Sequence, residues 1–117
     1  MSKPEELRNR TKLFALTVVK LFKALPKTGE AQVLGKQVLR CGTSVAANYR
    51  AVCRARSRAE FVSRIGIVVE EADETVFWME LLVDSAVVPA RRMNGLLTEA
   101  RELTAIFTAS QQTARGK

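Results

Sequence analysis

Apolar residues recur every three or four positions along four separate stretches of the chain, and this repeat is the strongest constraint on its fold. The second stretch shows it most clearly, with Leu34, Val38, Cys41, Val45 and Val52 within a narrow arc at 100° per residue. An α-helix places such positions on one face, whereas a half-buried strand needs an apolar residue at every second position. The sequence therefore predicts four amphipathic helices.

Residues that favour turns and caps separate the four stretches. Pro26 and Gly29 end the first helix, Ser57 followed by Glu60 is a capping-box pattern, and Pro89 marks the start of the fourth helix. The predicted helices cover residues 4–25, 31–54, 58–83 and 89–110, and residues 111–117 are predicted to be a frayed tail.

Four such helices joined by short links favour an all-α fold, an antiparallel up-down-up-down four-helix bundle that forms a single domain over residues 1–117. A length of 117 residues with 47% hydrophobic content is enough for one core. Gly35 and Gly42 lower helix propensity but permit close approach of a neighbouring helix. The predicted core consists of Val18, Leu21, Val38, Val45, Ile65, Ala72, Met79, Leu96 and Leu103.

The first and third helices carry more apolar residues than one bundle core requires. Phe22, Phe77 and Trp78 lie off the main stripes, as do Leu13 and Ile67. A surplus of this kind predicts a subunit interface, and the alternative is a thicker core. We expect a closed homo-oligomer.

Several kinds of catalytic and metal site are excluded or disfavoured. The chain has no histidine, which rules out Ser-His-Asp triads and His-containing metal sites. It has neither a Walker loop nor a Gly-x-Gly-x-x-Gly sequence. Cys41 and Cys53 fall about 18 Å apart on one predicted helix, too far for a disulfide, and are expected to be free thiols.

One dense acidic group lies in the third predicted helix. No second carboxylate cluster is present to complete a metal shell, so we expect these side chains to be solvated or to form salt bridges. The sequence therefore predicts no catalytic residue, no metal, no cofactor and no enzymatic activity. The group consists of Glu70, Glu71, Asp73 and Glu74.

Positive charge is concentrated in the first half of the chain. Residues 1–64 hold 14 Lys and Arg against 4 Asp and Glu, whereas residues 65–117 hold 5 against 8. Four basic residues fall within about 80° around the second predicted helix, and three more follow, with only Glu60 opposing them in this segment. The seven are Lys36, Arg40, Arg50, Arg54, Arg56, Arg58 and Arg64. The first helix would extend the patch with Arg8, Lys12, Lys20, Lys23 and Lys27.

This pattern predicts a surface that binds RNA, DNA or their hybrid. Arginine favours bidentate phosphate contacts, and no aromatic stacking platform accompanies the patch, because Tyr49 is expected at the core edge. We therefore expect this surface to contact phosphates without reading bases. The main alternative is an assembly module that docks an acidic protein and has no nucleic-acid role, and a membrane-surface role is a weaker third.

With no long apolar run and no signal-peptide pattern, we expect a cytoplasmic protein without a membrane partner.

Several short motifs, in their order along the chain, resemble those of a known protein family. They are QVLRCGTSVAAN at 37–48, ARS at 55–57, EF at 60–61 and EADETVFWMELL at 71–82. With these motifs the chain resembles the ribosomal RNA intervening-sequence proteins, a family of small four-helix bundles, over nearly its whole length. Family members often have Ile-Ala-Glu-Gly after the asparagine, where this chain has Tyr49-Arg-Ala-Val52, which adds positive charge.

The resemblance implies a homopentameric barrel of four-helix bundles. The family includes the accessory variability determinant of diversity-generating retroelements, which binds nucleic acid and a reverse transcriptase. The resemblance therefore implies nucleic-acid binding and admits a reverse transcriptase as a partner.

Overall fold

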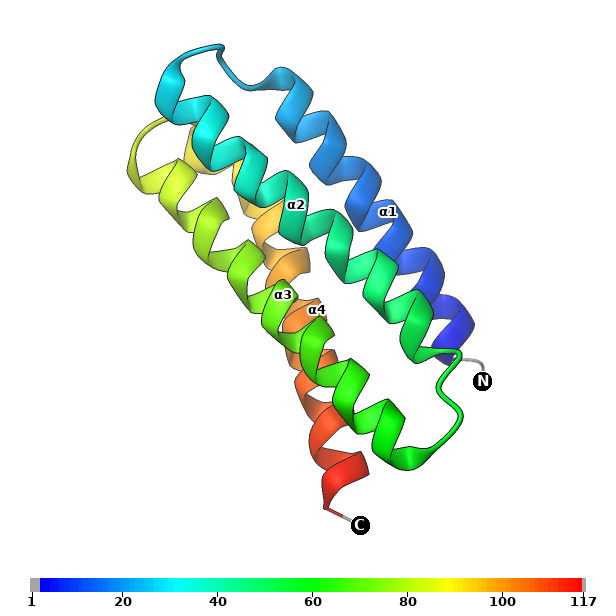
Figure 1. Cartoon of the computed structure of the whole chain (residues 1–117). Coiled ribbons are helices and arrows are strands. Elements are labelled where there is room, and N and C mark those ends of the chain that lie inside the picture. Colours follow the sequence, from blue (N-terminus) through cyan, green and yellow to red (C-terminus); the bar gives the residue numbers. More distant parts are fainter. Residues whose placement is uncertain (1–2, 117) are drawn as a thin grey trace.

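The computed structural model of the chain describes residues 3–116, and they form four long antiparallel helices (Figure 1). These are α1 (Lys3–Ala24), α2 (Gly29–Val52), α3 (Arg58–Asp84) and α4 (Ala90–Arg115). The bundle measures 46 × 23 × 22 Å, and both chain ends lie at the same end of it. The predicted all-α four-helix bundle is confirmed.

The four helices do not pack against one another equally. α2 packs closely on α1 and on α3, and α3 packs closely on α4, whereas α1 and α4 meet at few points. Within the described residues, the backbones of the diagonal pairs stay apart, and side chains such as Tyr49 of α2 and Phe107 of α4 meet in the core between them. The bundle is therefore closed along three seams and partly open along the seam between α1 and α4.

Most of the predicted core is buried. Val18, Val45 and Ile65 are completely inaccessible to solvent, and two predicted core residues differ from expectation. Leu21 and Leu96 are only half-buried, because both line a groove on the open seam. Leu97, one position along, is the buried leucine of α4. The remaining predicted core residues, Val38, Ala72, Met79 and Leu103, are buried.

Two glycines of α2 allow the close packing of α1, as expected from the sequence. A Cβ atom at Gly42 would lie 2.9 Å from a methyl group of Val18. A Cβ at Gly35 would overlap the end of the Leu25 side chain and touch the Phe22 ring. A larger residue at either position would require neighbouring side chains to move.

The start of α3 has the predicted cap, with one difference. The Ser57 hydroxyl accepts a hydrogen bond from the Glu60 backbone N–H at 3.0 Å. The Glu60 carboxylate returns to the Arg56 N–H at 3.1 Å, one residue before the position that a standard capping box uses. The loop between α2 and α3 is thereby tied to the first turn of α3.

The end of α4 differs from the prediction. Residues 111–115 are helical, so the predicted frayed tail is wrong there, and Lys117 lies outside the described residues. No helix breaker precedes Gly116, and Arg58 donates from Nε to the Ala114 carbonyl at 2.7 Å. Arg58 thereby supplies a donor for one of the carbonyl groups that the last turn of a helix otherwise leaves without a partner.

Candidate nucleic-acid interface

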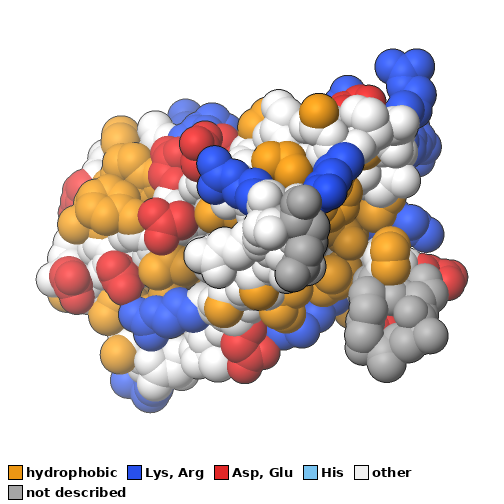
Figure 2. Space-filling view, turned by 90° about the horizontal axis from the view of Figure 1, so that it is seen from below, with side chains coloured by type: hydrophobic (Ala, Val, Ile, Leu, Met, Phe, Trp, Pro, Cys, Tyr) orange, Lys and Arg blue, Asp and Glu red, His pale blue; other side chains and the backbone are white. Residues whose placement is uncertain are grey.

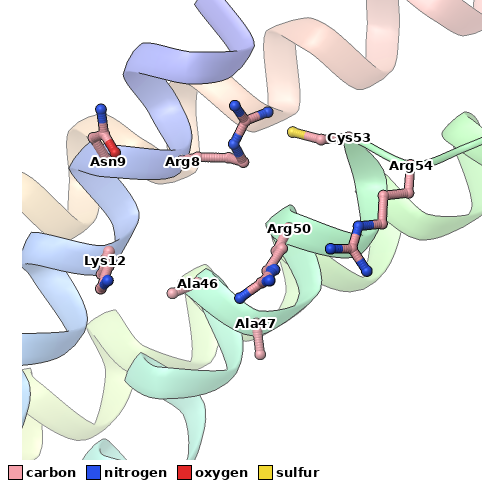
Figure 3. Close-up of a pocket in the computed structure, with 8 residues that line it drawn as sticks. All are labelled: Arg8, Asn9, Lys12, Ala46, Ala47, Arg50, Cys53 and Arg54. Carbon is pink, nitrogen blue, oxygen red and sulfur yellow. The ribbon is translucent and has the colours of Figure 1, made fainter.

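A hollow in the described surface lies between α1 and the end of α2. It has a volume of about 580 Å³. α1 contributes Arg8 and Lys12, and the C-terminal end of α2 contributes Arg50 with Arg54 just beyond it (Figure 3). The small side chains of α2 between these cations keep the hollow open, so positive groups from two helices line one concave surface.

A second hollow of about 350 Å³ continues this surface toward α3. It shares Arg50 and Arg54 with the first and adds Arg56 and Arg64. Arg50 and Arg54 therefore stand between the two hollows. We call the combined surface the basic groove, defined by Arg8, Lys12, Arg50, Arg54, Arg56 and Arg64.

One carboxylate lies inside the basic groove. Glu60 accepts from Arg64 Nε at 2.9 Å and lies 3.9 Å from Arg56 Nε. The Arg56 backbone N–H lowers the pKa of Glu60, and the Arg64 guanidinium lowers it further, so Glu60 is ionised at neutral pH. Glu60 therefore offsets part of the charge of Arg56 and Arg64.

The other four cations of the basic groove have no such neighbour. Within residues 3–116, none of these four side chains forms an ion pair. They are Arg8, Lys12, Arg50 and Arg54. Unpaired positive charges that converge on a concave surface concentrate the local field and attract anions.

Arg40, which the sequence pattern placed in the same basic stripe, is already paired. Its guanidinium donates to Glu74 and lies 3.5 Å from Glu71. Glu60 is the only acidic residue within the segment itself, but the packing of α2 on α3 brings Glu71 and Glu74 against Arg40, and the salt bridges expected of that acidic group are confirmed for these two. The Trp78 indole and Arg40 both lower the pKa of Glu74 through hydrogen bonds.

The remaining predicted basic residues lie outside the basic groove. Arg58 binds the end of α4, and Lys20 lines the groove on the seam between α1 and α4. Lys23 and Lys36 are exposed elsewhere on α1 and α2. The end view of the molecule shows Lys and Arg side chains in several places among acidic and hydrophobic ones (Figure 2).

The residues predicted for a subunit interface have different environments. Phe77 is 52% exposed and contacts the edge of Trp78, with ring centroids 4.9 Å apart. Trp78 is half-buried and donates from Nε1 to Glu74 at 3.0 Å. Phe22 is half-buried and packs at Gly35 within the seam between α1 and α2. Of these three, Phe77 is the side chain most available to a partner.

Both cysteines are free thiols, as expected. Burial raises the pKa of Cys41, whose Sγ donates to the Gln37 carbonyl at 2.7 Å. In residues 3–116, no three His, Cys, Asp or Glu side chains come together as metal ligands would. None of the described helices is both long enough and apolar enough to span a bilayer.

Comparison with known proteins agrees with this fold. The family model described as 23S rRNA-intervening sequence protein matches residues 5–109. The chain belongs to this family. The matched region contains every residue of the basic groove.

A solved structure is similar to this family member over nearly all of both chains. It is the crystal structure of a protein with unknown function from the S23 ribosomal protein family of Bacteroides thetaiotaomicron VPI-5482. The two share 30% sequence identity and superpose with a TM-score of 0.87, covering 95% of this chain and 99% of the other. A search of the curated proteins finds no match.

Proposed function

We propose that this protein is a non-enzymatic homo-oligomer that binds nucleic acid through phosphate contacts in the basic groove. The observation that supports this most directly is the convergence of four unpaired cations from α1 and α2 on one hollow of about 580 Å³. Guanidinium groups bind phosphate oxygens through paired hydrogen bonds, and three of the four cations are arginines.

The groove favours backbone contacts over base readout. Tyr49 is only 6% exposed, and its ring packs on Phe107 with centroids 5.0 Å apart, so it is not available to stack on a base. Neither Asn nor Gln lines the inner part of the groove around Arg50 and Arg54, and Asn9 stands only at the α1 edge. Binding that depends on phosphates alone is weakly dependent on sequence.

The family name points to RNA as the first ligand to test. The matching family is described by an intervening sequence of 23S rRNA. RNA is therefore the first probe, followed by DNA and an RNA–DNA hybrid. A role as accessory protein to a reverse transcriptase of a diversity-generating retroelement is a narrower form of the same proposal, supported by resemblance alone.

Self-association would raise the affinity of such a groove. A closed oligomer, five subunits in the form that the resemblance implies, repeats the groove around one particle. A strand that reaches two grooves binds the second one intramolecularly, so modest affinity for each subunit becomes higher overall affinity.

Replacing Arg50 and Arg54 with Gln tests the groove. We expect R50Q/R54Q to weaken binding to unrelated RNA sequences about equally. Binding releases fewer counterions when a phosphate contact is lost. The slope of log affinity against log salt should therefore flatten by about 0.7 to 0.9 for each lost contact. Fluorescence anisotropy at several salt concentrations measures both quantities.

A matched control removes the same charge elsewhere. K23Q/K36Q alters two exposed cations outside the groove and should leave the salt slope close to that of the wild type. Equal effects of the two double variants would show that only net charge matters. If wild-type protein binds no RNA, DNA or hybrid at low salt, the proposal fails and an acidic protein becomes the partner to seek.

A further inference from the structure

The open seam between α1 and α4 contains an apolar groove of about 490 Å³, which we call the seam groove. Leu21 and Leu96 line its walls, and Met93, which is fully buried, lies at its base. Lys20 and Arg92 also line it, and no carboxylate does. A surface that fills the seam groove must therefore be apolar at its centre, and negative charge beside that centre would complement the two cations.

The outer face of α3 has an apolar side chain of this kind at its centre. Phe77 is 52% exposed, an unusual position for a phenylalanine in a bundle whose core is already filled. Residues three and four positions away are its neighbours on the helix surface, and they include Asp73 and Glu74 on one side and Glu80 and Leu81 on the other. Three of these four are acidic.

Two carboxylates near Phe77 remain available to a partner. Glu74 pairs with Arg40, and Glu80 pairs with Arg101 at 2.8 Å. Glu70 and Asp73 are exposed, and within the described part of the chain neither forms an ion pair. The α3 face thus offers an exposed aromatic ring beside two unpaired negative charges, the complement of the seam groove.

We infer that the outer face of α3 in one copy docks into the seam groove of the next copy. Phe77 occupies the apolar groove, and Glu70 and Asp73 face Lys20 and Arg92. This inference rests on the self-association included in the proposed function. It adds the two surfaces that meet and the charges that set their orientation.

The two surfaces are different and lie on different sides of the bundle, since α1 and α3 are diagonal neighbours. The contact is therefore heterologous, and each copy both offers its α3 face and receives another. Repetition of such a contact gives a ring when the rotation closes. A buried aromatic anchor with charges at its rim is the usual arrangement of an interface with a few dominant residues.

Charge reversal tests the pairing directly. K20E/R92E and E70K/D73K each place like charges against each other, so we expect both variants to lose assembly and run near the 13.0 kDa mass of one chain in light scattering. The fourfold variant K20E/R92E/E70K/D73K restores opposite charges at every contact and should regain the wild-type mass. F77D should dissociate the assembly, whereas F77L should retain it.

K23E/R91E is the matched control, because Lys23 and Arg91 are exposed cations that do not line the seam groove. It should keep the wild-type mass, and circular dichroism verifies that all variants remain helical. A monomeric wild type, or failure of the fourfold variant to reassemble, overturns the inference. Neither result touches the proposed RNA binding, which is read separately from the salt slope of R50Q/R54Q.

Discussion

At the residue scale, Glu60 has a double role in the basic groove. Its carboxylate holds the loop before α3 through the Arg56 N–H and also neutralises part of the charge of Arg56 and Arg64. Because its pKa is lowered in the folded protein, its stabilising effect is present above the ordinary Glu range and is lost as pH falls through the lowered pKa. At neutral pH, Glu60 therefore competes with phosphate for two arginines.

Replacing Glu60 with Gln should strengthen RNA binding. The uncharged amide no longer offsets Arg56 and Arg64, so both become available to phosphates and the salt slope should steepen by up to about 0.7 to 0.9 for each new contact. Anisotropy titrations at several salt concentrations measure this. E30Q makes the same change of charge in the first turn of α2, outside the basic groove, and an equal steepening there would contradict the argument.

The sequence could identify the basic residues but not all of their partners. The helical period correctly places Arg40 on the polar face of α2. No local pattern, however, shows that Glu74, 34 positions later, reaches it. The sequence did name Arg8 as an extension of the patch, and the packing of α1 beside the end of α2 brings it to the same hollow as Arg50. Leu96 and Leu97 are adjacent, and only the packing of α4 decides which of them is buried.

At the scale of helices, two glycines with opposite surroundings allow a paired prediction. G42A should destabilise the protein by about 1 kcal/mol, because overpacking costs about 1 to 3 kcal/mol and the gain in helix propensity recovers up to about 1. The clash falls on Val18, a stiff β-branched side chain. G95A should stabilise by up to about 1 kcal/mol, since nothing lies within 4 Å of its added Cβ.

Urea unfolding followed by circular dichroism measures both changes. G42A and G95A make the same substitution inside a helix, so their difference isolates the packing of α1 on α2 from helix propensity. If G42A is as stabilising as G95A, the close approach at Gly42 has no energetic consequence.

Helix positions were more predictable than helix ends. Apolar periodicity placed all four helices, because it reflects the face that each one buries. The end of α4 was missed because its last turn is supported by Arg58 from the start of α3. A contact between residues so far apart leaves no mark in the local composition of residues 111–115.

At the scale of the whole molecule, α1 and α4 have few close backbone contacts, although Arg10 of α1 donates to Glu99 and Glu102 of α4, so α1 is held mainly by its seam with α2. One end of that seam is lined by four unpaired cations from the two helices. Repulsion among these cations opposes the close packing of α1 on α2 that Gly35 and Gly42 allow. α1 is therefore the helix that we expect to separate first from the other three.

This arrangement has a consequence for local opening. Backbone amides of α1 should exchange with deuterium through a partial opening, faster than those of α3. RNA bound in the basic groove bridges α1 and α2, so it should slow exchange in α1 more than in α3, and R50Q/R54Q should lose most of this protection. Exchange followed by mass spectrometry measures both effects, and uniform protection of all four helices would contradict them. If the prediction holds, bound RNA supplies the counter-charge for the four cations and stabilises the packing of α1 on α2.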